Sequence, residues 1–234
     1  MMNIHQAIED LYRNKVYSNT GNKDVLKQVP AEAKTVLDVG CGAGDNASIL
    51  KALHKKVTGI TISEAEAKLV SDICDKVMVI NIEEQVSLVL DKFDVIILSH
   101  VCEHLRYPTL ILKNLANNLA KNGIMIVAVP NMAFYRNRWK LLKGDWQMME
   151  SGPFDKTHLK FFSYLTANTL CDEKRLKVGK KIPSLLALPL WPLRLILPRF
   201  CKQLDKIIGN WFPNLFARQT ILILEHNDNL CQDL

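Results

Sequence analysis

A short segment from Thr35 to Asn46 constrains the fold of this chain more than any other part of the sequence. It joins branched apolar residues to three closely spaced glycines and then to the start of a predicted helix. Branched residues of this kind suit a strand that is buried on both faces, and glycines let the backbone turn sharply and approach a ligand closely. Amide groups at the start of a helix bind anions and carboxylates. The segment therefore predicts a buried strand, a tight turn with outward-pointing amides, and a ligand site.

The spacing of the glycines distinguishes between two kinds of ligand. Gly40, Gly42 and Gly44 alternate with single residues, whereas the fingerprint for a dinucleotide pyrophosphate places its third glycine one residue later. Preceded by Asp38, the segment closely resembles motif I of the class I S-adenosylmethionine-dependent methyltransferases. The resemblance implies that S-adenosyl-L-methionine binds here and leaves as S-adenosyl-L-homocysteine, in contact with Asp38, Gly40, Cys41, Gly42 and Gly44.

The rest of the chain alternates apolar runs with helix-length segments. After the glycine loop, strands are expected at 57–62, 76–82, 93–99 and 123–129, and helices at 46–53, 64–71, 84–90 and 109–120. A helix at 163–174 and strands at 176–182 and 219–225 are expected to follow. Alternation of this kind predicts a doubly wound α/β fold with a mostly parallel sheet and with ligands at the carboxyl ends of the strands. The resemblance implies its seven-stranded, Rossmann-like methyltransferase form.

The length and composition of the chain fit one elaborated domain. A chain of 234 residues with 48% hydrophobic content can bury one large core. We expect residues 1–129 to form a cofactor-binding half, 130–216 a substrate-binding elaboration, and 217–234 the last strand and the tail. The elaboration includes an apolar, proline-broken insertion at 183–216, just before the last strand.

The cysteines and the apolar runs indicate where such a protein would work. Six cysteines, at positions 41, 74, 102, 171, 201 and 231, lie far apart without a Cys-x-x-Cys pair. The polar opening residues lack the apolar core of a signal peptide, and no apolar run reaches the roughly 18 residues that span a bilayer. We therefore expect a reduced, cytoplasmic protein without a membrane-spanning helix.

The positive charge of the chain is concentrated in one part of it. The net charge is +6, and residues 130–206 hold 15 Lys and Arg against 6 Asp and Glu, which gives +9 there and −3 elsewhere. A local basic surface suggests an anionic substrate or an anionic membrane, with an ordinary solvated surface as the alternative. The segment has no basic stripe interleaved with aromatic residues and no zinc-ligand spacing, which argues against a nucleic-acid partner and predicts no metal site.

Two positions depart from the usual pattern of the family. Most members carry an acidic residue at Thr61, where a carboxylate would bind the ribose hydroxyls, and another at Asn81 near the adenine. The variant Gly59-x-Thr61-x-Ser63 resembles that of cyclopropane fatty-acid synthases and sterol methyltransferases, so we still expect cofactor contacts from Thr61 and Ile62. Asn81 can still pair with the adenine amino group through its side-chain oxygen, and Ile82 would supply an apolar face for the adenine. The alternatives are that Thr61 caps the following helix beside Ser63 and that Asn81 is an ordinary loop residue.

The fourth strand leads into a segment that resembles motif IV of the family. Ser99 and His100 would contact the cofactor, and Glu103 would contact the methionine portion or orient a histidine. Transfer to a hydroxyl requires alignment, exclusion of water and removal of a proton, and histidine suits the last task near neutral pH. His104 and His100 are therefore candidate bases, with a structural role for either as the alternative.

A narrower pattern follows the fifth strand. Pro130-Asn131 precedes an arginine-containing helix, and Asp155-Lys156-Thr157-His158-Leu159-Lys160-Phe161-Phe162-Ser163 comes later. This combination resembles a bacterial methyltransferase subgroup associated with cell-surface polysaccharide biosynthesis. The resemblance implies a substrate pocket with Asp155 and His158 as catalytic candidates and with Tyr135, Arg138 and His158 as substrate ligands. Rings and charged groups of this kind suit a glycan. A well-packed loop with Ser163 as a helix cap is the alternative.

The insertion is the least typical part of the chain. Between 184 and 216 it is apolar, interrupted by prolines and edged with Arg194, Arg199, Lys202 and Lys206. It is suited to the interface of a membrane, with Trp191 and Trp211 at headgroup depth. A lid over the pocket and a homodimer contact are the alternatives.

These patterns together predict an S-adenosylmethionine-dependent O-methyltransferase that acts on a sugar hydroxyl of a surface glycan or its nucleotide- or lipid-linked precursor, in the cytoplasm or at the inner face of the membrane. His104 or His158 would be the base. Two alternatives stay open: a small-molecule or lipid methyltransferase, and a non-catalytic partner protein that binds the cofactor.

Overall fold

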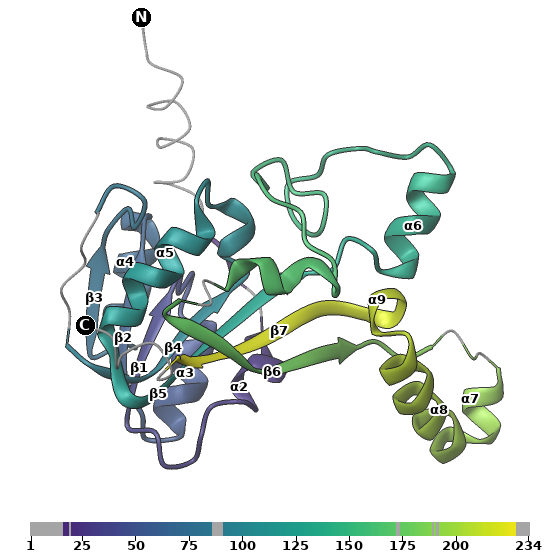
Figure 1. The fold of residues 1–234 in the computed structure, drawn as a ribbon, viewed down its shortest axis with the longest axis horizontal. Coiled ribbons are helices and arrows are strands. Elements are labelled where there is room, and N and C mark those ends of the chain that lie inside the picture. The colour runs from purple at the N-terminus through teal and green to yellow at the C-terminus, as the bar shows by residue number, and fades with distance from the viewer. Residues whose placement is uncertain are drawn as a thin grey trace, which may run out of the picture.

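The computed structural model describes residues 16–18, 20–85, 91–171, 174–188, 190 and 192–227. In this part of the chain, seven strands form one sheet in the order β3-β2-β1-β4-β5-β7-β6 (Figure 1). The first five strands in this order are parallel, β7 runs antiparallel to them, and β6 at the edge pairs antiparallel with β7 and so runs in the same direction as the first five. The predicted α/β, mostly parallel fold is therefore confirmed. The strands are β1 (Thr35–Val39), β2 (Lys56–Thr61), β3 (Lys76–Val79), β4 (Phe93–Ser99), β5 (Leu119–Pro130), β6 (Leu176–Leu185) and β7 (Ala217–His226).

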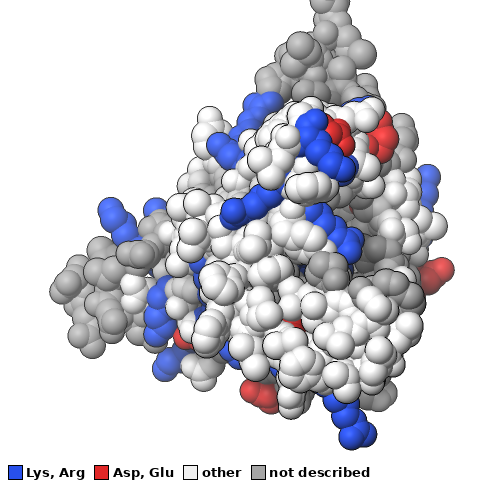
Figure 2. Space-filling view, turned by 90° about the vertical axis from the view of Figure 1, so that its right-hand side faces the viewer, with Lys and Arg blue, Asp and Glu red and all other residues white. Residues whose placement is uncertain are grey.

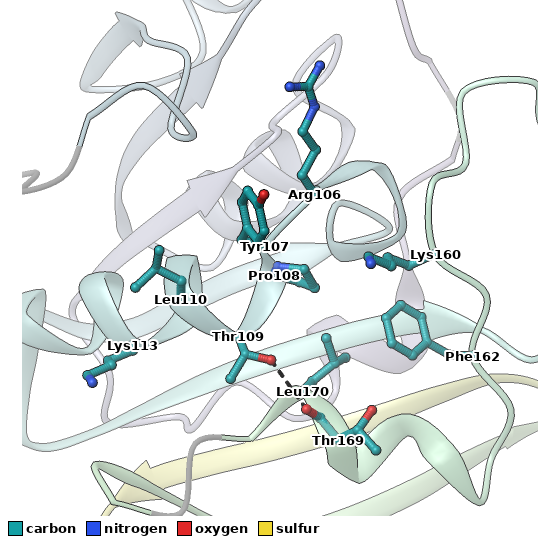
Figure 3. Close-up of a pocket in the computed structure, with 10 residues that line it drawn as sticks. All are labelled: Arg106, Tyr107, Pro108, Thr109, Leu110, Lys113, Lys160, Phe162, Thr169 and Leu170. Carbon is teal, nitrogen blue, oxygen red and sulfur yellow. Dashed lines mark hydrogen bonds between the residues drawn. The ribbon is translucent and has the colours of Figure 1, made fainter.

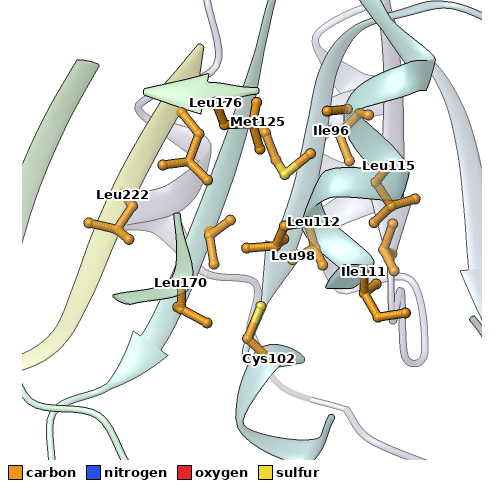
Figure 4. Packing of buried hydrophobic residues seen from close by; sticks show 14 of the residues in the cluster. Ile96, Leu98, Cys102, Ile111, Leu112, Leu115, Met125, Leu170, Leu176 and Leu222 are labelled. Carbon is orange, nitrogen blue, oxygen red and sulfur yellow. The ribbon is translucent and has the colours of Figure 1, made fainter. Parts of the chain in front are cut away.

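Helices cover both faces of the sheet. They are α2 (Lys23–Leu26), α3 (Asp45–Ala52), α4 (Glu64–Val70), α5 (Pro108–Leu115), α6 (Tyr135–Leu142), α7 (Leu193–Ile196), α8 (Pro198–Trp211) and α9 (Pro213–Phe216), with 3-10 helices η1 (Cys102–His104), η2 (Ala116–Asn118) and η3 (Thr166–Leu170). Because successive side chains of a strand point to opposite faces, β4 contributes to two cores. Ile96 and Leu98 pack in the cluster that contains Leu112 of α5 (Figure 4), and Val95 and Ile97 pack in the cluster that contains α3.

The structure corrects several predicted boundaries. The helix expected at 163–174 is only the short 3-10 helix η3. Ser163 and Thr166 bond each other through side chain and backbone, because the Thr166 hydroxyl accepts from the Ser163 amide and the Ser163 hydroxyl accepts from the Thr166 amide. Local bonds of this kind compete with helix formation. The helix expected at 109–120 ends at Leu115, and β5 begins at Leu119. Most of the helix expected at 84–90 lies outside the described residues.

Two segments extend away from the body of the sheet (Figure 1). One carries α6, and the other carries α7, α8 and α9 between the long strands β6 and β7. The second corresponds to the insertion predicted from the sequence, although Trp191 lies outside the described residues. None of the helices in the described part of the chain is both long enough and apolar enough to cross a membrane.

Candidate active site

The glycine loop after β1 has the backbone conformation that its sequence predicted. Gly40, Gly42 and Gly44 have φ values of +70°, +55° and +85°, which lie in the left-handed region. A side chain there would be strained, and a Cβ on Gly42 would lie 2.6 Å from the carbonyl oxygen of Tyr17. Glycine is therefore required at this turn for its conformation and for the close approach of the segment at Tyr17.

The amides of the loop do not point outward as expected. Those of Gly40 and Cys41 donate to the carbonyl oxygen of Ile60 at 2.8 and 3.0 Å, and that of Ala43 donates to Tyr17 at 2.8 Å. The expectation is wrong at these three positions because the end of β2 and the segment at Tyr17 bind the amides. The Cys41 side chain is also turned into the core, where its Sγ atom lies beside Gly59 and where burial raises the pKa of its thiol.

Asp38 offers a ligand-binding group next to this loop. Its side chain is 1% exposed, and its Oδ2 atom has no hydrogen-bond partner among the described residues. Burial raises the pKa of this carboxyl group to about 7, against a smaller opposite effect of a hydrogen bond with Asn46. An unsatisfied buried oxygen is costly, so a ligand that donates a hydrogen bond or carries positive charge would fit here. The amino group of S-adenosylmethionine meets that requirement.

A carboxylate does lie at the end of β2, at the position where the family usually has an acid. It belongs to Glu66, which the sequence analysis did not predict as a site residue. Thr61 donates to Oε2 of Glu66 at 2.5 Å, and the other oxygen of Glu66 accepts from the Tyr17 amide at 2.9 Å. Ser63 accepts from the Glu66 amide, and its own amide donates to Thr61. The capping alternative for Thr61 and Ser63 therefore matches these contacts. The signal was available, because Ser63 and Glu66 have the spacing of a capping box.

Asn81 also bonds within its own turn. Its side-chain oxygen accepts from the Glu83 amide at 3.1 Å, and its Nδ2 atom donates to Glu84 at 2.9 Å. Ile82 and the neighbouring Ile80 pack against the core cluster on the α5 face, and Ile62 is partly exposed. These contacts give Asn81 a turn-forming role, which matches the alternative hypothesis that it is an ordinary loop residue.

Ser99 and His100 belong to a polar network at the end of β4. His100 has a φ of +60°, and its ring nitrogens lie 3.2 Å from Glu103 Oε1 and 2.7 Å from Gln219 Oε1. Asn22 donates to both Ser99 and Gln219. Desolvation lowers the pKa of His100, but the hydrogen bond and charge of Glu103 raise it on balance. Both ring nitrogens therefore have protein partners, which favours the structural alternative for His100.

His104 is oriented by a chain of hydrogen bonds that fixes its tautomer. Asp155 is buried and accepts from the hydroxyl of Thr157 at 2.6 Å. The Thr157 oxygen lies 2.9 Å from Nδ1 of His104 and must accept there, because its own hydrogen is donated to the carboxylate. Nδ1 therefore carries a hydrogen, and Nε2 carries a lone pair in the neutral ring. Burial, as the largest effect, lowers the pKa of His104 and favours this neutral form.

His158 lies next to His104. Its Nδ1 atom is 3.2 Å from the carbonyl oxygen of Pro153, which can only accept, so Nδ1 carries a hydrogen and the neutral ring has its lone pair on Nε2. The two rings meet edge to face with centroids 4.7 Å apart. The amides of Leu159 and Lys160 donate to the backbone oxygen of Glu103 and so attach this loop to η1. The structure thus brings together His104 and His158, which lie far apart in the sequence.

Glu103 completes the group. Its side chain is 1% exposed, its Oε1 atom lies beside His100, and its Oε2 atom has no hydrogen-bond partner in the described part of the chain. One potential ligand atom from each of Glu103, His104 and His158 lies within 4.8 Å of the other two. We call these three residues the Glu-His-His centre.

Tyr135 and Arg138 lie on α6 in a different environment. The Tyr135 ring packs against Phe134 and Phe216, and Arg138 donates to the carbonyl oxygen of Ala133 at 2.7 Å. Arg138 also lines a cavity of about 520 Å³ between α6 and the segment from Asn210 to Leu215. The structure therefore places these two predicted substrate ligands beside the insertion. Asp155, in contrast, accepts a hydrogen bond from Thr157 and is connected to His104 through that residue.

A second hollow of about 520 Å³ lies at the start of α5 (Figure 3), and its lining residues Arg106 and Lys160 follow closely after His104 and His158 in the sequence. Tyr107 and Pro108 face Phe162 and Leu170 across it, and Thr109 donates to the carbonyl oxygen of Thr169. Its basic lining residues are Arg106, Lys113 and Lys160. A hollow with both apolar and basic lining suits an acceptor that carries a ring and a negative charge.

Comparison with solved structures places the fold among methyltransferases. A possible histamine N-methyltransferase from Thermotoga maritima has a TM-score of 0.59 and 18% identity, with 87% of this chain and 86% of the other covered. An O-methyltransferase of a polyketide synthase from Brevibacillus brevis, in complex with S-adenosyl-L-homocysteine, has a TM-score of 0.54 and 18% identity, with coverages of 89% and 72%. At such identities the likeness concerns the fold alone.

The family assignment is more specific. Residues 12–177 match the model of a family described as "Methyltransferase domain", and the chain belongs to this family. S-adenosylmethionine is the cofactor of this family. A ubiquinone biosynthesis O-methyltransferase from Histophilus somni is 30% identical over 119 residues, and one from Glaesserella parasuis is 29% identical over 109. The matches cover 47% and 42% of this chain and about half of each relative, at 49% and 46%.

Proposed function

We propose that this protein methylates a hydroxyl group of an anionic glycan precursor, with S-adenosylmethionine as the donor. The observation that carries the proposal is the Glu-His-His centre, in which two histidine nitrogens with lone pairs lie beside a buried carboxylate. Such a centre favours a substrate group that donates hydrogen bonds. Among groups that can accept a methyl group, a hydroxyl is the simplest of that kind.

Two groups of residues, at the ends of the neighbouring strands β1 and β4, would bind the two substrates of the reaction. Asp38 and the glycine loop would hold the cofactor, and the Glu-His-His centre would hold the acceptor hydroxyl and promote the loss of its proton. Bound S-adenosylmethionine supplies a methyl group on a positively charged sulfur. Transfer needs the acceptor oxygen in line with that group, so the rigid placement of His104 by Thr157 and of His158 by Pro153 contributes by orientation.

The charge around the acceptor side supports an anionic substrate. Lys160, Arg106 and Lys113 line the hollow at the start of α5, and residues 130–206 carry a net charge of +9. A nucleotide- or lipid-linked sugar has both a hydroxyl-rich ring and phosphate groups. Tyr107 and Phe162 in the same hollow offer aromatic surface for a sugar face.

A second candidate is O-methylation of a phenolic hydroxyl in a lipid-soluble small molecule. The curated relatives with the name ubiquinone biosynthesis O-methyltransferase favour it, as do the many exposed apolar side chains of α7 and α8. The same centre would serve either acceptor, because both lose a proton from oxygen.

The test is incubation of the protein with methyl-labelled S-adenosylmethionine and a fractionated extract of the source cells. Label in the glycan or lipid-linked sugar fraction would support the first candidate. Label in extractable lipid or small molecules would support the second. Label only in protein or nucleic acid, or attached to nitrogen or carbon on analysis of the product, would refute both.

A further inference from the structure

We propose that the Glu-His-His centre binds a divalent transition-metal cation such as Zn²⁺ or Mn²⁺. The inference rests on the proposed function only for the role of the cation in catalysis, because the binding itself follows from the geometry of the site. Sequence spacing gave no sign of it, since His158 is far from His104 along the chain and the two meet only through the loop contacts with η1.

The three side chains present lone pairs to one another without a hydrogen to share. His104 and His158 each use the hydrogen on Nδ1 toward an acceptor elsewhere, so their Nε2 atoms accept only. The carboxylate form of Glu103 also accepts only. One potential ligand atom from each residue lies within 4.8 Å of the other two, so three groups that can ligate a metal meet in one small volume. A cation satisfies all three at once.

The surroundings of the three side chains match those of metal ligands. A histidine that binds a metal usually donates its other ring hydrogen to a carbonyl, carboxylate or hydroxyl group, which fixes the ring. His158 has Pro153 in that role, and His104 has Thr157 backed by Asp155. His100 lies against Oε1 of Glu103, so Oε2 is the oxygen left for a ligand, and it is buried without a partner in the described part of the chain.

The donor atoms indicate the kind of cation. Two imidazoles and one carboxylate suit Zn²⁺, Mn²⁺ or Fe²⁺, whereas Mg²⁺ and Ca²⁺ prefer sites made of oxygen alone. Three protein ligands leave at least one coordination position for the acceptor oxygen. A cation there would lower the pKa of the acceptor hydroxyl, and the proton would pass to solvent or to a nearby base as the oxygen takes the methyl group.

The first experiment measures metal binding directly. The protein is freed of metal with a chelator, dialysed, and titrated separately with Zn²⁺, Mn²⁺ and Mg²⁺ while heat and bound metal per chain are recorded. We expect one equivalent of Zn²⁺ or Mn²⁺ to bind, and to bind at least about tenfold more weakly to Glu103→Gln and His158→Ala, as for the loss of a ligand. His226→Ala, which removes a histidine at the end of β7, is the control. No binding, or equal binding by all variants, would overturn the proposal.

Methyl transfer separates this inference from the proposed function. Wild-type protein without metal should still bind the cofactor but transfer methyl groups slowly, and Zn²⁺ or Mn²⁺ should restore the rate. Full activity without metal would overturn the catalytic role of the cation and leave the proposed function intact. One equivalent of metal bound with no transfer to any hydroxyl acceptor would instead support the site and count against the proposed function.

An independent observation supports a second proposal, which concerns the surface of the insertion. We infer that α7 and α8 bind the surface of an anionic lipid bilayer. Phe200, Ile207 and Trp211 lie along one exposed line of α8, and Trp211 is 77% exposed. In α7, Leu195 and Ile196 are also largely exposed. Large apolar side chains in this number are unusual on a surface that meets only water.

The charged side chains near this exposed line indicate that its binding partner is anionic. Arg199, Lys202 and Lys206 are exposed on α8, while the acidic Asp205 is engaged by Arg194 at 3.0 Å. The end of the molecule that carries these helices shows broad uncharged surface with more basic than acidic side chains (Figure 2). Apolar side chains flanked by cations fit an interface with acidic headgroups better than they fit a neutral protein surface.

Sedimentation with vesicles tests this proposal. We expect the protein to bind vesicles of phosphatidylcholine with phosphatidylglycerol much more than vesicles of phosphatidylcholine alone, and Trp211→Ser with Phe200→Ser to lose most of that binding. Leu69→Ser, which removes an exposed leucine from α4, is the control. Binding that is absent, or unchanged in the double variant, would overturn the proposal, as would a double variant that changes only the oligomeric state.

Discussion

Two buried carboxylates at the ends of neighbouring strands show how differently the two halves of the site are built. Asp38 in β1 and Glu103 just after β4 each have one oxygen without a hydrogen-bond partner among the described residues. Asp38 lies beside neutral groups and has a raised pKa, whereas Glu103 lies among three histidines. Asp38 therefore favours a ligand that donates a hydrogen bond or carries positive charge, whereas Glu103 is one member of a group of side chains.

The two halves of the site also differ in how far apart their residues lie in the sequence. The glycine loop and Asp38 belong to one continuous segment. The Glu-His-His centre needs η1 and the loop at 157–160, which are connected through the backbone oxygen of Glu103. The cofactor end should therefore tolerate changes in the insertion and in the loop, while the acceptor end should respond to both.

The largest expected effect comes from removing one histidine. His158→Ala should lower kcat by about 100-fold or more, because it removes a group that holds the acceptor hydroxyl and promotes the loss of its proton, while cofactor affinity changes less than about twofold. Steady-state kinetics with titration of the cofactor would measure both. His226→Ala should match wild type. Equal loss of cofactor affinity would show that the two ends are not separate.

The matching change at the cofactor end is Asp38→Asn. It removes an oxygen that would face the amino group of the cofactor, so we expect affinity to fall by about tenfold to a hundredfold, as for a hydrogen bond to a charged group. Isothermal titration would measure it. An unchanged affinity would mean that the unsatisfied oxygen of Asp38 serves another ligand.

The same variant should be more stable than wild type at alkaline pH in the absence of cofactor. The folded pKa of about 7 lies above the unfolded value of 3.8, so the folded state holds its proton longer. Stability from this group is thus full below pH 3.8, falls as pH rises, and is lost above pH 7, by up to about 4 kcal/mol. Thermal unfolding at pH 5 and pH 8 should show a smaller decline in Asp38→Asn.

Thr157→Val tests whether the tautomer of His104 matters. Valine has a similar shape but cannot accept from Nδ1, so the ring would lose its fixed orientation. We expect kcat to fall by about tenfold with little change in KM, and Thr157→Ser to retain most of the activity. A loss of activity in both variants would indicate a packing effect instead.

The sequence predicted the cofactor end better than the acceptor end for a physical reason. The strand, the glycines and Asp38 form a local pattern, and local patterns can be read in order. Glu66 was not predicted as the carboxylate at the end of β2, because it belongs to the helix that follows and reaches Thr61 from there, whereas the family pattern places its acid at position 61 itself. The pairing of His104 with His158 depends on contacts between distant segments, which no spacing reveals.

The smallest expected effect comes from Glu66→Gln, which tests whether this carboxylate is structural or binds the cofactor. Glu66 accepts from Thr61 and from the Tyr17 amide, so its two oxygens already have partners, unlike those of Asp38 and Glu103. Glu66→Gln keeps one of these bonds and should cost about 1 kcal/mol of stability, with cofactor affinity reduced less than in Asp38→Asn. Urea unfolding and isothermal titration would measure the two effects. A loss of affinity as large as that of Asp38→Asn would place Glu66 among the cofactor ligands and shift the boundary between the two halves of the site toward β2.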